Sequence, residues 1–131
     1  MCNRCVPNQI MFSTLKQLGA DGIYDKAIDC IKEHGFSNHA TSDPYTKEID
    51  IWGAILLACG AKEKLLAEGF MEAEECGVPP FMCGRSRFFC EYLELITDTE
   101  ISEWCSTHTQ TEALFLLVRA SERVAITFLR P

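Results

Sequence analysis

Apolar residues recur along most of the chain at the spacing of helical turns. In residues 21–34 they fall at i, i+4, i+7, i+8 and i+11, which is one face of an amphipathic helix. These positions are Ile23, Ala27, Cys30, Ile31 and His34. Asp21 can cap this helix and Gly35 can end it. A shorter helix is predicted before it, from Asn8 to Leu18.

The centre of the sequence changes from polar to almost wholly apolar. Residues 36–45 are mostly polar and contain Asp-Pro, so we predict a loop there. Residues 49–59 are apolar on nearly every side, and a helix without a polar face belongs in the middle of a domain. Thr46 or Asp43 is expected to cap this central helix.

Turn residues divide the second half of the sequence into further helices. Residues 61–76 combine an apolar stripe with a glutamate-rich outer face, which predicts a fourth helix that Gly69 weakens or bends. The Gly-Val-Pro-Pro sequence that follows predicts a break. Ser86 is expected to cap a fifth helix beyond that break.

Two capping boxes predict the last two helices. Thr97 with Glu100 would start a short helix, and Thr109 with Glu112 a long final one. No stretch alternates cleanly enough to force a strand, and residues 125–130 are the one short run that could extend.

These patterns predict an all-α protein. The chain has 131 residues, of which 47% are hydrophobic, and this suits one domain with one core. We expect an N-terminal arm over residues 1–7, followed by a compact single-domain bundle of about five to seven helices over residues 8–131.

The charge balance favours a basic partner over nucleic acid or membrane. Asp and Glu number 19 against 12 Lys and Arg, for a net charge of −7, which repels phosphate backbones and anionic lipids. No apolar run reaches the roughly 18–20 residues of a membrane span, and the N-terminus lacks a signal-peptide pattern. We therefore expect a cytoplasmic protein.

The glutamate-rich face of residues 61–76 is the first candidate for partner recognition. We expect Glu72, Glu74 and Glu75 to border an interface with a basic protein. Glutamates alone add little affinity, so Phe70 or Met71 is expected to supply an apolar anchor. The alternative interpretation is an ordinary solvated surface.

A second candidate is an anion site. Arg85, Ser86 and Arg87 are expected at the start of the fifth helix, where free N–H groups and the helix dipole favour phosphate or a nucleotide. Two solvated arginines are the simpler interpretation.

The cysteines raise the question of zinc. Cys2 and Cys5 form a Cys-x-x-Cys, which needs a second ligand pair to hold a tetrahedral zinc ion. The sequence offers Cys76 with Cys83, or Cys105 with His108. We favour a free arm without a cofactor and keep zinc as the alternative.

Cys105 and His108 could instead be a nucleophile and its base, because residues at i and i+3 face each other on a helix. The sequence offers no obvious loop of oxyanion donors. A buried cysteine beside a capping turn is the preferred interpretation, so a Cys/His enzyme is the last alternative.

Three segments together resemble a known family. They read KAIDCIKEHGFS, DIWGAILLACGA and ISEWCSTHTQTEALFLLVRASE, and lie within residues 26–124. In this order they are similar to a small helical family of unknown function found in actinobacteria and their phages. The resemblance implies a helical fold and a phage or mobile-element context. We therefore expect a non-enzymatic accessory protein that engages a host protein through an acidic surface.

Overall fold

Six helices make up the part of the chain that the computed structural model describes, residues 20–129. They are α2 (Ala20–His34), α3 (Ile51–Ala58), α4 (Glu63–Ala67), α5 (Pro80–Thr97), α6 (Ile101–Ser106) and α7 (Gln110–Leu129). Within residues 20–129 there is no strand, only isolated bridges from Phe36 and Ser42 to Ile49. The all-α prediction is confirmed. The predicted arm, the first helix, Cys2 and Cys5 lie outside the described residues.

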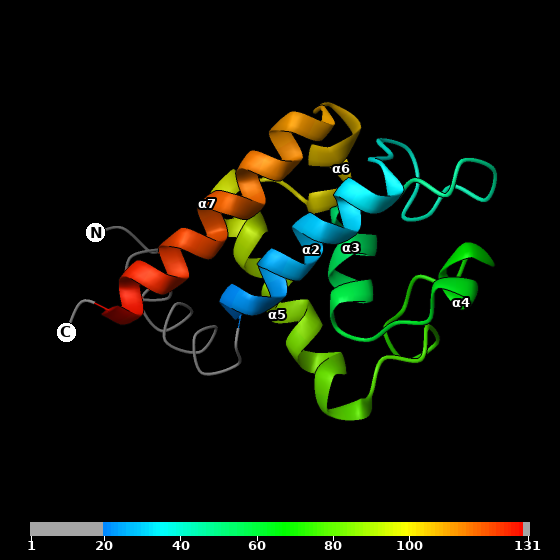
Figure 1. The fold of residues 1–131 in the computed structure, drawn as a ribbon, viewed down its shortest axis with the longest axis horizontal. Helices are drawn as coiled ribbons and strands as arrows, with labels where there is room; N and C mark the ends of the chain where they lie inside the picture. Colours follow the sequence, from blue (N-terminus) through cyan, green and yellow to red (C-terminus); the bar gives the residue numbers. More distant parts are fainter. Residues whose placement is uncertain (1–19, 130–131) are drawn as a thin grey trace.

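The helices α2 and α7 lie side by side on one face of the molecule (Figure 1). α2, drawn in blue, packs between α7 and α3, while α5 crosses behind them and contacts all three. The short helix α6 contacts α3 and α5, and α4 lies at the edge of the molecule. Within the described residues, no helix combines the length and the apolar character of a membrane span.

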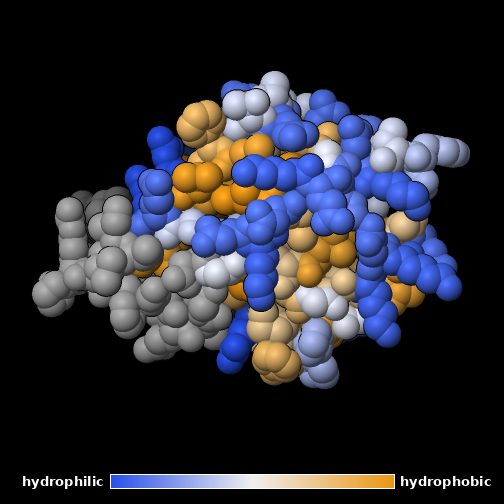
Figure 2. Space-filling model, viewed as in Figure 1, coloured by the Kyte–Doolittle hydropathy of each residue, from blue (hydrophilic) through white to orange (hydrophobic). Residues whose placement is uncertain are grey.

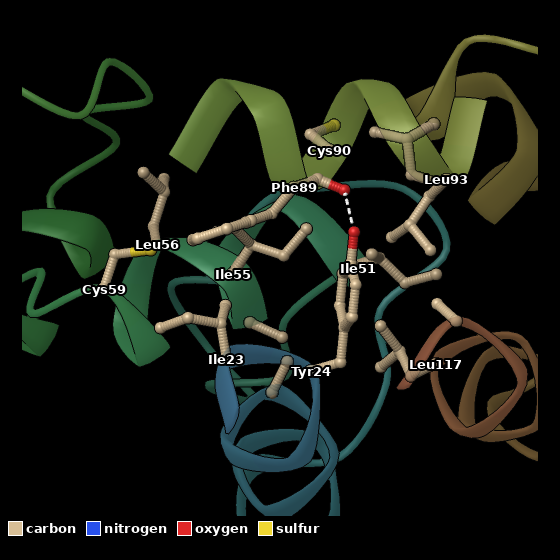
Figure 3. Packing of buried hydrophobic residues seen from close by; sticks show 14 of the residues in the cluster. Ile23, Tyr24, Ile51, Ile55, Leu56, Cys59, Phe89, Cys90, Leu93 and Leu117 are labelled. Atoms are coloured by element: carbon tan, nitrogen blue, oxygen red, sulfur yellow. Dashed lines mark hydrogen bonds between the residues drawn. The ribbon is translucent and has the colours of Figure 1, made fainter. Parts of the chain in front are cut away.

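The core forms around α3, as its apolar sequence predicts. Ile51, Ile55 and Leu56 are fully buried, and Figure 3 shows them between side chains of α2 and α5. Tyr24 reaches across this core, where its hydroxyl donates to the carbonyl oxygen of Phe89 at 2.6 Å. The Tyr24 hydroxyl is therefore buried together with a hydrogen-bond partner.

The structure differs from the sequence-based predictions at several helix ends. α3 is capped by Asp50, and Asp43 or Thr46 has no part in that cap. α4 spans only five residues, because the chain turns at Gly69 with φ of +101° instead of continuing to residue 76.

The predicted start of α5 is wrong. The helix begins at Pro80, whose missing N–H costs nothing in the first turn, so the second proline opens the helix that we expected to begin at Ser86. Ser86 lies fully buried inside α5 and donates from its hydroxyl to the Cys83 carbonyl oxygen at 2.7 Å.

One capping box is confirmed and the other is wrong. The Thr109 N–H donates to the Glu112 carboxylate at 2.9 Å, and the Glu112 N–H to the Thr109 hydroxyl at 3.3 Å. Thr97 instead ends α5, and the Ile101 N–H at the start of α6 donates to the Glu94 carboxylate at 2.8 Å. Residues 125–129 do not extend but continue α7.

Candidate functional site

The loop between α2 and α3 is held by its own side chains. The buried Ser37 hydroxyl accepts the N–H groups of His39 and Ala40, at 3.3 and 3.1 Å. The Asp43 carboxylate accepts the Tyr45 and Thr46 N–H groups and lies 2.8 Å from His39 Nε2. These backbone hydrogen bonds, with that to His39, lower the pKa of Asp43.

This loop rests on the first turn of α3. The Asp50 N–H donates to the Thr41 carbonyl oxygen at 3.2 Å, and the Asp50 carboxylate accepts the Gly53 N–H at 2.8 Å. A Cβ at Gly53 would lie 2.4 Å from the Thr41 oxygen, so only glycine allows this approach. The contact fixes Asp50 at the point where the loop, α5 and α6 meet.

A cleft of about 370 Å³ opens above Asp50, between α3, α5, the start of α6 and residues 71–72. We call it the acidic cleft. Its lining holds the carboxylates of Asp50, Glu72, Glu91, Glu94 and Glu100. Among the described residues of the lining, Arg87 is the one cation, which leaves an excess of four negative charges when all are ionised.

Apolar side chains complete the walls of the acidic cleft. Trp52, Met71 and Ile101 line it beside the carboxylates. The Trp52 Nε1–H donates to the Met71 carbonyl oxygen at 2.9 Å, which ties residues 71–72 to α3. A neighbouring pocket of about 280 Å³ shares Asp50 and Met71 and extends the cleft toward His39.

Several carboxylates of the cleft already have structural partners. Glu72 pairs with Arg87 at 3.0 Å, Glu94 caps α6, and Glu100 accepts the Ser102 hydroxyl at 2.8 Å. Each of these bonds uses one carboxylate oxygen, so the second oxygen can still accept from a ligand.

Burial sets the protonation of Asp50 and Cys90, which line the acidic cleft, and of Cys105, which lines the neighbouring pocket. Asp50 is 4% exposed, and desolvation raises its pKa to about 6 against the opposing effect of its backbone hydrogen bonds. Burial also raises the pKa of Cys90, and that of Cys105 to about 12. Both thiols are therefore protonated at neutral pH, which disfavours nucleophilic chemistry.

The acidic cleft contains only part of the predicted interface. Met71 and Glu72 line it, whereas Phe70, Glu74 and Glu75 are exposed outside its lining. The predicted outer face of residues 61–76 is therefore split by the turn at Gly69, and only the segment that packs on Trp52 reaches the cleft.

The predicted anion site loses its helix start. Arg85 and Arg87 lie inside α5, beyond the first turn whose N–H groups are free. Arg85 stacks over the Phe81 ring at 5.6 Å, and Arg87 pairs with Glu72. Ser86 points into the core, so the three residues do not converge on a ligand.

Two of the predicted metal ligands make other hydrogen bonds in the structure. The Cys76 thiol donates to the Phe70 carbonyl oxygen at 3.3 Å, and the Cys83 thiol to that of Val78 at 3.5 Å. Between residues 20 and 129, no group of three or more potential ligands is placed to hold a metal ion. A zinc site that includes Cys2 and Cys5 stays a prediction.

Cys105 and His108 line different pockets. Cys105 is buried beside Asp50, in the pocket that extends the acidic cleft. The His108 ring stacks on Trp104 with centroids 3.8 Å apart and lines a separate groove along α7. This geometry gives no support to a nucleophile and base at these positions.

Sequence reasoning missed most of the acidic cleft. Glu91 and Glu94 lie four and seven residues after Arg87, which was expected in an anion site, so the three share a face of α5 and the two glutamates could have been noticed. Asp50 and Glu100 reach the same cleft from distant segments, and the pattern along the chain carries no signal for that meeting.

The fold and the cleft define a small all-α protein with an acidic, half-apolar cleft. Comparison of the chain with protein-family models, with curated proteins and with solved structures gave no match. The resemblance to the helical family of actinobacteria and phages stays a prediction.

Proposed function

We propose that the protein is a non-enzymatic binding protein whose acidic cleft receives a basic side chain of a protein partner. The observation that carries this proposal is the meeting of five carboxylates with Trp52 and Met71 around one cleft. The partner is a protein with a basic face, as the net charge of −7 also favours.

The chemistry of arginine and lysine fits such a cleft. Their charged ends are attracted by the carboxylates, and their aliphatic stems can pack on apolar walls such as Met71 and Ile101. A guanidinium group can also stack on an indole such as Trp52. Partial enclosure strengthens these charge interactions relative to an open surface.

The resemblance to a phage-associated family adds a context to this proposal. In that context the protein is an accessory protein of a phage or mobile element, and the basic partner belongs to the host. The alternatives have less support, because Arg85 and Arg87 already have partners and the Cys105 thiol is protonated at neutral pH.

A basic peptide can test the cleft before any partner is identified. Trp104→Phe leaves Trp52 as the single tryptophan, so its fluorescence reports on the acidic cleft alone. Titration with a short arginine-rich peptide is expected to change this fluorescence saturably, and added salt is expected to weaken the binding.

Charge removal identifies where the peptide binds. Glu91→Gln with Glu100→Gln is expected to raise the peptide Kd about tenfold. The matched control changes Glu33 and Glu68, two exposed glutamates outside the acidic cleft, to Gln. Equal effects of the two double variants would show that the peptide responds only to overall charge, against the proposal.

A further inference from the structure

The outward face of α7 carries a single stripe of side chains. Its members are Glu112, Phe115, Arg119 and Glu122, which are spaced alternately by three and four residues and line one groove together with His108 from the turn before α7. This spacing keeps side chains on one side of a helix. The core side of α7, with Ala113, Leu117 and Ala120, is opposite.

The stripe has both a protruding aromatic group and an apolar recess. Phe115 is 72% exposed, and the groove beside it has a volume of about 640 Å³ with Ile96, Trp104 and Leu116 in its walls. Figure 2 shows apolar side chains at the surface over the middle of α7. A large exposed aromatic beside an apolar groove is typical of an interaction surface.

The charges along the stripe are ordered so that two antiparallel copies of it would place opposite charges against each other. When a second copy of α7 runs antiparallel, with the two Phe115 side chains at the centre, Glu112 of each copy faces Arg119 of the other. Each copy offers its Phe115 to the groove of the other, so one surface supplies both halves of the interface.

We propose that this face of α7 is a two-fold interface between two copies of the chain. The order of charges argues for a second copy over an unrelated partner, because an unrelated partner would need no such self-complementarity. The interface lies apart from the acidic cleft and does not depend on its function.

Sedimentation velocity of the full chain at increasing concentration tests the proposal. The wild type is expected to shift from monomer to dimer. Phe115→Asp is expected to raise the dimer Kd by at least about tenfold. Phe81→Asp is the matched control, because Phe81 is a 66% exposed phenylalanine of α5 outside the groove. A monomeric wild type at every concentration, or equal effects of the two variants, would overturn the interface.

A mixing experiment separates pairing with a second copy from any other association. Arg119→Glu places two glutamates opposite each other, and Glu112→Lys places a lysine opposite an arginine, so each variant alone is expected to stay monomeric. Mixed together, they restore opposite charges at both positions and are expected to dimerise.

The result that contradicts the proposal is a mixture that remains monomeric while both variants are folded by circular dichroism. Because Glu112 also caps α7, Glu112→Lys can lose helix stability. If that variant fails to fold, the sedimentation of the wild type and of Phe115→Asp still shows whether the chain forms this dimer.

Discussion

Asp50 serves the fold and the acidic cleft with one carboxyl group. It caps α3 through the Gly53 N–H and lies at the floor of the cleft with a pKa of about 6. The folded protein therefore holds the proton of this group more tightly than the unfolded chain, whose aspartate pKa is near 3.8. The free energy of unfolding must depend on pH through this residue.

Replacing Asp50 by Asn is expected to reduce that pH dependence. In the wild type, the raised folded pKa means that the contribution of Asp50 to stability is greatest below about pH 4 and is lost as the pH rises through about 6, by up to about 3 kcal/mol. Asn keeps an oxygen for the cap but does not titrate. Urea unfolding at pH 5 and pH 7.5 measures the difference, and an unchanged pH slope in the variant would contradict this account.

Gly53 is the second residue whose replacement has a definite outcome. Gly53→Ala forces the loop away from α3, since the added Cβ would lie 2.4 Å from the Thr41 oxygen, and a loss of about 1–3 kcal/mol is expected. Gly22→Ala is the control, because nothing lies within 4 Å of a Cβ there and alanine favours α2 by up to about 1 kcal/mol. Thermal unfolding of both variants should show opposite shifts, and equal shifts would speak against the close contact.

The long helix α7 packs on the core through one buried side. Leu117, on the core side of α7, is fully buried. Leu117→Ala is therefore expected to lower the free energy of unfolding by about 2–5 kcal/mol. Val118→Ala, at a neighbouring position that is 39% exposed, should cost much less. Chemical denaturation of the two variants makes the comparison; similar losses would mean that Leu117 does not pack as described.

How well each helix could be predicted depends on where its ends are determined. α2 and α7 were predicted because their stripes and the Thr109–Glu112 box are local in sequence. The start of α6 depends on Glu94 from the preceding helix, and α4 is cut short at Gly69. The first effect is not contained in the residues that flank the start of α6. Gly69 does flank the end of α4, but a glycine can bend a helix as well as end it.

The acidic cleft is a property of the whole molecule, which explains why only Met71 and Glu72 of its lining were predicted for the interface, while Arg87 was predicted for a separate anion site. Its walls come from α3, α5, α6 and two loops, which contribute Thr41 and residues 71–72. Their meeting depends on tertiary packing around α3, so no single segment shows the complete set.

Once an affinity pull-down has supplied a partner, charge reversal can locate its binding surface. Glu72→Lys is expected to slow association and to reduce its salt dependence, because Glu72 lines the acidic cleft. Glu74→Lys with Glu75→Lys changes more charge but lies outside the lining, and should have the smaller effect. Stopped-flow rates at low and high salt measure both; a larger effect of the Glu74 and Glu75 pair would move the interface to the outer glutamates.

The six free cysteines of the described residues make the molecule a reporter of its own breathing motions. Five are buried and Cys30 is half-buried, and burial raises the thiol pKa throughout the set. An alkylating reagent therefore modifies the interior thiols only after the helices around them part. The order in which Cys59, Cys90 and Cys105 become labelled would rank the local opening free energies of α3, α5 and α6 without any engineered tag.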